Sequence, residues 1–178
     1  MNFVAATVLR GRGRGGLVCY SQWTRPSDAG PDGSPPLVVP KRWSLRDCLP
    51  EFVLLESRTY KVVFVERSDG VDKPTEVSAD ATPLAHFGMF TVSTDKQARM
   101  IELARRYAPN SLTTPGLTAI DFHRSLDGTR VVNFGLWTTF DSFDSLLDKD
   151  GFENEAPYWT GVADFQPDFF DIATVEAA

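Results

Sequence analysis

The feature that most constrains the fold of this chain is a repeat within its own sequence. Residues 18–24 align with residues 132–138 at a constant offset of 114 residues. The first segment is Val18-Cys19-Tyr20-Ser21-Gln22-Trp23-Thr24, and it aligns with Val132-Asn133-Phe134-Gly135-Leu136-Trp137-Thr138. At the same offset Ala5 falls on Ala119 and Arg10 on Arg124. Each stretch is later followed by an apolar run that ends in Val-Glu, residues 60–66 and 170–176. Two related units are the economical interpretation, and a chance match of short β-type strings is the alternative.

Residues 84–178 follow one legible order of elements. A strand over 86–92 is followed by a helix, with a capping-box pattern at Thr94 and Gln97 and a stop at Pro109-Asn110. Two β-rich runs, 117–124 and 129–137, are joined by a segment containing Asp127-Gly128, a strong hairpin signal. A second helix to about Asp148 and a strand over 169–176 complete the unit. This order is the ferredoxin-like split βαβ motif, so the predicted fold class is α+β.

The first unit, residues 1–67, is expected to be incomplete. Met1 lies almost directly before the run that matches 117–124, so the first strand and helix have no counterpart. A Pro/Gly/Ser-rich insertion over 25–40 favours a loop or lid, and residues 68–83 are interpreted as a linker. A ferredoxin-like sheet carries helices on one face only, so a second sheet is expected to bury the other face, as in a tandem barrel. The edge left by the incomplete unit predicts a homodimer.

Composition excludes several classes of partner. The chain has 18 basic and 24 acidic residues, a formal net charge of −6, which gives phosphate backbones and anionic lipids little to bind. No run approaches the about 18 apolar residues of a membrane span, and the start of the chain lacks the pattern of a secretion signal, so a cytoplasmic protein is expected. Cys19 and Cys48 lack CxxC spacing and are expected to be free thiols. With only two histidines besides, no metal site is predicted.

The second strand of the hairpin carries the candidate site. Side chains alternate along a strand, so one face holds Val131, Asn133, Gly135 and Trp137, and the other holds Val132, Phe134 and Leu136. The all-apolar set is expected to pack on the helices, which places the other set in the barrel interior. Pairing across the turn puts Phe122 opposite Asn133, Ile120 opposite Gly135 and Thr118 opposite Trp137. Such a pocket, with Asn133 as its polar group and a gap at Gly135 that leaves space for a ring, suits a flat aromatic ligand; the alternative is an ordinary core in which Asn133 bonds to the backbone.

These residues carry a family resemblance. The hairpin His123-Arg124-Ser125-Leu126-Asp127-Gly128-Thr129-Arg130, continued by Val131-Val132-Asn133-Phe134-Gly135-Leu136-Trp137, closely resembles that of the antibiotic biosynthesis monooxygenases, small dimeric α/β-barrel proteins of aromatic polyketide pathways. The resemblance covers Leu84–Glu176 well and Phe3–Arg67 faintly. It implies insertion of oxygen into an anthrone-type phenol without flavin, heme or metal, with the deprotonated substrate itself reducing dioxygen. Asn133 and Trp137 match the residues that contact substrate and oxygen, whereas Phe122 replaces a family tyrosine.

Further candidates surround the same pocket. Trp159 and Tyr158 follow Pro157 and are expected to cap the pocket mouth or to pack at the domain interface. His86 begins a strand and is a candidate base, whereas His123 and Asp121 fall on the face opposite Asn133. In the first unit Trp23 is retained but Cys19 replaces the asparagine, so a single active pocket is expected in the second unit.

Three functions remain open at the level of sequence. The first is a cofactor-independent oxygenase that acts on a polycyclic aromatic polyketide with dioxygen. The second is a non-oxidative cyclase or rearrangement enzyme, or a polyketide-binding protein, on the same barrel, which the loss of the tyrosine hydroxyl at Phe122 favours. A heme-degrading monooxygenase is a weaker alternative, because neither His86 nor His123 lies in the C-terminal helix expected to supply the axial ligand. Fold alone does not separate these functions.

Overall fold

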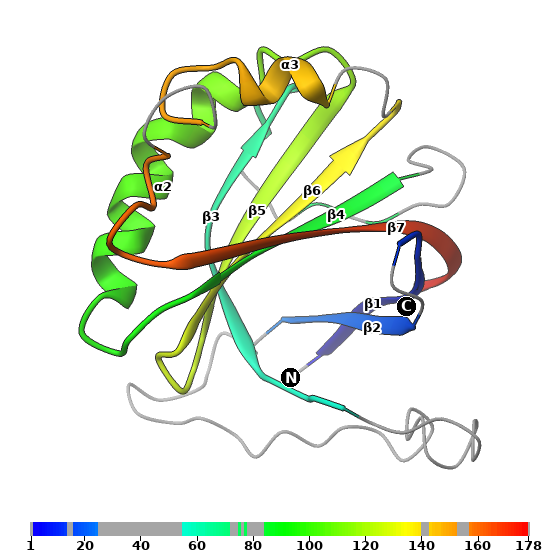
Figure 1. Cartoon of the computed structure of the whole chain (residues 1–178). Coiled ribbons are helices and arrows are strands. Elements are labelled where there is room, and N and C mark those ends of the chain that lie inside the picture. The colour runs from blue at the N-terminus through cyan, green and yellow to red at the C-terminus, as the bar shows by residue number, and fades with distance from the viewer. Residues whose placement is uncertain are drawn as a thin grey trace.

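The structure is a computed structural model that describes residues 2–13, 16–24, 55–71, 75, 77, 84–139, 143–152 and 157–177. The expected insertion over 25–40, most of the expected linker over 68–83 and Cys48 lie outside the described residues. Within these ranges the strands form one curled, 7-stranded antiparallel sheet in the order β2-β1-β7-β4-β6-β5-β3 (Figure 1).

The second unit has the predicted ferredoxin-like order. It comprises β4 (Leu84–Thr91), α2 (Gln97–Ser111), β5 (Leu117–Ser125), β6 (Arg130–Trp137), α3 (Asp144–Leu147) and β7 (Asp164–Ala177). Its strands pair in the order β7-β4-β6-β5, with α2 and α3 over the same face of the sheet (Figure 1). This arrangement confirms the α+β fold class.

The strands of the first unit extend this sheet at both edges. They are β1 (Asn2–Gly11), β2 (Leu17–Thr24) and β3 (Tyr60–Arg67). Strand β1 pairs with β7, and β3 pairs with β5. Each unit therefore pairs its last strand with the other unit. In the second unit β4 lies between β7 and β6. In the first unit the counterpart of β7 is β3 and the counterpart of β6 is β2, and these two strands form the edges of the described sheet.

The two hairpins share their register, which confirms the sequence repeat. Phe3 pairs with Trp23 and Leu117 pairs with Trp137, and in both hairpins a β-bulge follows at once, between Phe3 and Ala5 and between Leu117 and Ala119. Every later pair also matches at the same offset. A bulge inserts one unpaired residue. The expected pairing of Thr118 with Trp137 is therefore wrong.

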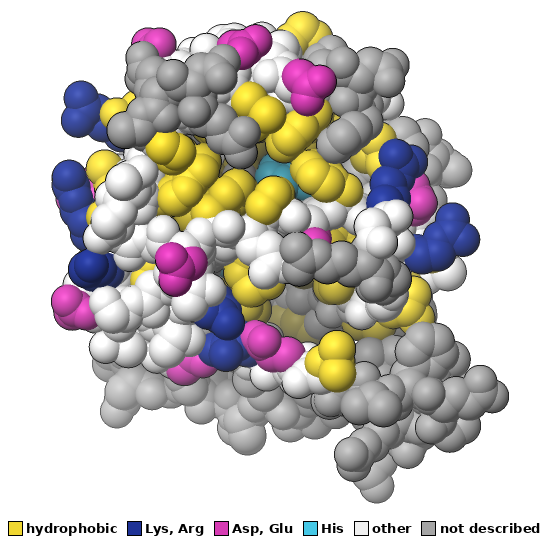
Figure 2. All heavy atoms as spheres, viewed as in Figure 1, with side chains coloured by type: hydrophobic (Ala, Val, Ile, Leu, Met, Phe, Trp, Pro, Cys, Tyr) yellow, Lys and Arg dark blue, Asp and Glu magenta, His cyan; other side chains and the backbone are white. Residues whose placement is uncertain are grey.

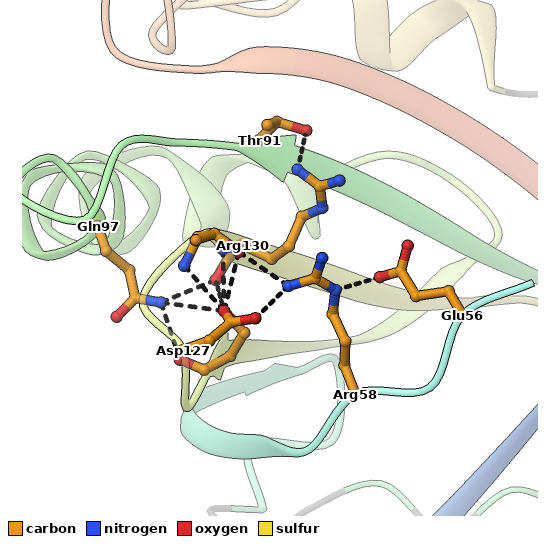
Figure 3. Close-up of polar contacts among 8 residues, drawn as sticks. Glu56, Arg58, Thr91, Gln97, Asp127 and Arg130 are labelled. Carbon is orange, nitrogen blue, oxygen red and sulfur yellow. Dashed lines mark hydrogen bonds and ion pairs between the residues drawn. The ribbon is translucent and has the colours of Figure 1, made fainter.

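Side-chain contacts fix the β5–β6 hairpin to its surroundings (Figure 3). The amide of Gln97 donates to the backbone carbonyls of Ser125 (3.0 Å) and Arg130 (2.9 Å), which joins the start of α2 to the hairpin. Arg58 forms an ion pair with Asp127 at the hairpin tip, so the segment before β3 is joined to it as well. The two Gln97 bonds thus hold the start of α2 against the hairpin, and the ion pair holds the segment before β3 against the tip of the hairpin.

The helices depart from the sequence predictions in three details. Gln97 makes the contacts just described, and the residue before the helix, Lys96, has no side-chain cap bond, so the predicted capping box is wrong. Helix α2 continues through Pro109 to Ser111. Helix α3 spans four residues only.

In the described part of the chain no helix is both long and apolar enough to cross a membrane.

Both faces of the sheet are apolar, and this overturns the predicted assignment of faces. Met100, Ala104 and Ala108 of α2 pack with Val131 and Trp137 in one core. On the other face Phe134 and Leu136 pack with Leu9, and Val18 and Tyr20 of β2 lie against them, inside the curled sheet. The face of Asn133 is therefore the helix-covered face, and the all-apolar set lines the barrel interior. The reason is that the first unit needs an apolar surface to pack on as much as the helices do.

Candidate active site

An internal cavity lies between the helix-covered face of the sheet and the helical layer. Its walls come from β4, β5 and β6, from the end of α2 and from the α3 region: His86, Ala108, Ser111, Leu117, Ile120, Phe122, Asn133, Leu146, Phe152 and Tyr158. The space open to the centre of a water-sized sphere is about 20 Å³. One water needs roughly 10–15 Å³ by this measure, so the cavity as it stands admits a water or a diatomic molecule and excludes a tricyclic ring.

Asn133 is the unsatisfied polar group of this cavity. It lies in the middle of β6, opposite Phe122 on β5 and Gly88 on β4. Its Oδ1 is buried and has no hydrogen-bond partner among the described residues. Such a group costs about 1–3 kcal/mol of stability. The Oδ1 of Asn133 is therefore not bonded to the backbone of the described residues, and this atom is available to a ligand.

His86 and Trp137 form a buried pair beside Asn133. The indole Nε1–H of Trp137 donates to Nδ1 of His86 at 3.1 Å. Trp137 is fully buried and does not line the cavity, whereas His86 does. Gly135, opposite His86, makes the pair possible, because a Cβ at residue 135 would lie 2.3 Å from the imidazole Nδ1. The space that the sequence predicted for a ligand ring at Gly135 is thus filled by the imidazole of His86.

The surroundings of His86 keep its imidazole neutral. Phe169 stacks on the ring at a centroid distance of 5.8 Å, and Phe143 contacts its edge at 6.5 Å. Burial in this aromatic pocket lowers the pKa of His86 to about 4. The neutral ring holds one proton, and because Nδ1 accepts from Trp137, that proton lies on Nε2. His86 is therefore a donor in the resting site, whereas the sequence offered it as a base.

The remaining cavity walls are aromatic. Ile120 and Phe122 line the cavity as expected for their strand positions, and Phe122 stacks on Phe64 at 4.6 Å. Tyr158 also lines the cavity, and burial raises the pKa of its hydroxyl. Trp159 lies one layer further out, where it packs on Phe90 at 5.6 Å and does not line the cavity.

The other candidates lie away from this cavity. On β2, the indole of Trp23 donates to Ser21 Oγ at 3.0 Å, and Cys19 is an exposed free thiol. His123 and Asp121 lie on the face opposite Asn133, as predicted, but that face lines the barrel interior and not the helical layer, contrary to the expectation. There Nε2 of His123 lies 3.0 Å from the hydroxyl of Tyr20. Among the described residues no three His, Cys, Asp or Glu side chains gather as a metal site requires.

Sequence reasoning missed the wall that α2 provides. Ala108 and Ser111 line the cavity at the C-terminal end of the helix, and Ala104 packs one turn before them. Small residues at this spacing on the buried stripe of a helix leave space above a sheet. The run Ala104, Ala108, Ser111 was therefore the signal that a cavity lay under α2.

The fold is shared with solved structures of other proteins. No protein-family profile matches the sequence, and no curated protein is similar to it. Among solved structures, an anthrone oxidase-like protein shares 16% identity, with 100% of this chain and 80% of that one covered at a TM-score of 0.72.

Two further structures share the fold. A candidate monooxygenase from Fusobacterium nucleatum (10% identity) matches over 99% of this chain and 79% of its own, at a TM-score of 0.62. A ferredoxin-fold protein from Listeria monocytogenes related to antibiotic biosynthesis monooxygenases (10% identity) matches over 95% and 80%, at 0.54. The structural neighbours thus include anthrone oxidase-like and antibiotic biosynthesis monooxygenase-like proteins of ferredoxin fold, in agreement with the resemblance in the hairpin.

Proposed function

We propose that this protein is a cofactor-independent monooxygenase that oxidises an anthrone-type phenol of a polycyclic aromatic polyketide to a quinone. The observation that carries the proposal is the position of Asn133 in a cavity of about 20 Å³ with largely apolar walls, where its Oδ1 has no hydrogen-bond partner among the described residues. A cavity of this size and polarity suits dioxygen. An amide inside it can donate to an oxyanion where no bulk water competes.

The overall reaction balances without an external reductant. Overall, the methylene carbon of the anthrone gives up two hydrogens, the first of them as the proton lost on deprotonation, and four electrons pass to dioxygen. One oxygen atom becomes the quinone carbonyl, and the other leaves as water. Negative charge passes from the phenolate to the developing peroxide, and an oriented donor such as the Asn133 amide stabilises it by about 3 kcal/mol.

The aromatic substrate binds at the mouth of the cavity in this proposal, because the cavity itself is too small for its rings. Figure 2 shows a hydrophobic patch below α3 with a histidine side chain visible in its middle. Phe143 and Phe169, which contact His86, are partly exposed, so a flat ring placed against them meets aromatic partners. The reacting carbon would then face the dioxygen held beside Asn133.

The test is oxygen uptake with an anthrone such as dithranol, using protein treated with chelator and stripped of flavin. Uptake above the uncatalysed rate, with one oxygen atom from labelled dioxygen in the quinone, supports the proposal. Tight binding of the anthrone without uptake contradicts it and favours the cyclase or binding alternative. The absence of a hydroxyl at Phe122 is the observation behind that alternative.

A further inference from the structure

We propose that His86 is a catalytic hydrogen-bond donor of this site, and that Trp137 is a positioning residue that acts through His86. The inference rests on the proposed function, since it concerns the same cavity. It changes the role that the family resemblance implies for Trp137, from direct contact with substrate and oxygen to control of a neighbouring imidazole.

The donor and acceptor chemistry of the pair leaves one arrangement. An indole N–H can only donate, so the 3.1 Å contact makes Nδ1 of His86 the acceptor. A neutral imidazole carries a single proton, which must then lie on Nε2. Nε2 has no hydrogen-bond partner among the described residues, and His86 lines the cavity. The tautomer fixed by Trp137 therefore leaves a donor for a molecule in the cavity.

Packing around His86 fixes the position of the ring, and the hydrogen bond from Trp137 selects its orientation. Gly135 is the residue directly opposite on β6, and the ring occupies the place of its missing side chain. Phe169 stacks on one side of the ring. If the imidazole only filled space, a phenylalanine ring could replace it in such a setting. The directed Trp137 contact distinguishes a ring that is oriented from one that is merely packed.

His86 and Asn133 are placed to act on one small ligand. His86 pairs with Gly135, and Asn133 lies two residues from Gly135 on the same face of β6. Diagonal neighbours of this kind have Cβ atoms roughly 7 Å apart. A molecule between two such side chains can receive a hydrogen bond from each. The pair thus forms a two-point donor site for bound dioxygen as it becomes an oxyanion.

The first test reads the tautomer directly. In nitrogen-15 NMR of imidazole-labelled protein, wild-type His86 should be neutral with its proton on Nε2, and Trp137→Phe should shift its population toward the Nδ1–H tautomer. Trp23→Phe, at the equivalent position of the first unit, is the matched control and should leave the His86 signals unchanged. An unchanged His86 tautomer in Trp137→Phe would overturn the inference, whether or not the protein oxidises anthrones.

The second test separates the donor from the ring. His86→Phe should lower kcat at least 30-fold with KM changed less than threefold, while His86→Gln, which restores an amide donor, should recover part of the loss. Trp137→Phe should cost less than His86→Phe and add nothing to it in the double variant. Additive losses, or a fully active His86→Phe, would contradict the inference. If neither the wild-type protein nor any variant consumes oxygen, binding of 1,8-dihydroxyanthraquinone provides a second readout. The bound ligand should shift the NMR signal of His86 Nε2–H, and an unchanged signal would count against the role of His86 as a donor.

Discussion

Gly135→Ala should destabilise the protein by about 2–4 kcal/mol through its effect on His86. The new Cβ would lie 2.3 Å from Nδ1 and 2.5 Å from Cε1 of the imidazole, where ordinary contact begins at 3.4 Å. The ring must therefore retreat by about 1 Å, which disrupts its 3.1 Å bond to Trp137. Overpacking of this kind costs about 1–3 kcal/mol, and a lost hydrogen bond about 0.5–1.5 kcal/mol. The expected fall in Tm is about 5–15 °C for a chain of this length.

Urea unfolding measures the loss in free energy of unfolding, and a double-mutant cycle tests whether contact with His86 causes this loss. In a His86→Ala background the clash is removed, so Gly135→Ala should there cost less than about 1 kcal/mol, a coupling of about 1.5–3 kcal/mol. Gly88→Ala, in the neighbouring strand β4, is the matched control, because its nearest neighbour is the movable ring of Phe165 at 3.0 Å. An equal cost of Gly135→Ala in both backgrounds would refute the argument.

Three further predictions concern activity, pH and assembly. Asn133→Ala should lower kcat by about two to three orders of magnitude and leave the urea midpoint nearly unchanged, because Oδ1 has no hydrogen-bond partner among the described residues to lose; wild-type turnover or an unfolded variant would argue against its role. Burial lowers the pKa of His86 to about 4 from 6.5, so the unfolded chain takes up this proton first as pH falls. His86 should therefore not affect the free energy of unfolding above about pH 7.5 and should lower it by about 2 kcal/mol at pH 5. This loss between about pH 7.5 and pH 5 should be absent when unfolding of His86→Gln is measured. The edges β2 and β3 of the described sheet predict a homodimer, and light scattering that gives 19.7 kDa across micromolar concentrations would contradict it.

The sequence by itself determined those features that depend on local patterns. Alternation along β6 placed Asn133, Gly135 and Trp137 on one face, and the Asp127-Gly128 turn set the pairing of Phe122 with Asn133. The repeat at a constant offset predicted two equivalent hairpins, because register and bulge are encoded within each hairpin. The order of elements in residues 84–178 gave the ferredoxin-like class for the same reason.

Only the tertiary structure decided what covers each face and what fills each gap. Alternation assigns side chains to two faces, but both faces here are apolar, so the pattern could not say which one α2 covers. The glycine gap at Gly135 is filled by His86 from another strand, a contact between residues 49 positions apart along the chain, from 86 to 135. The bond from Trp137 that fixes the His86 tautomer depends on the same pairing of β4 with β6. Contacts of this range follow from the packing of whole elements, and no local pattern carries them.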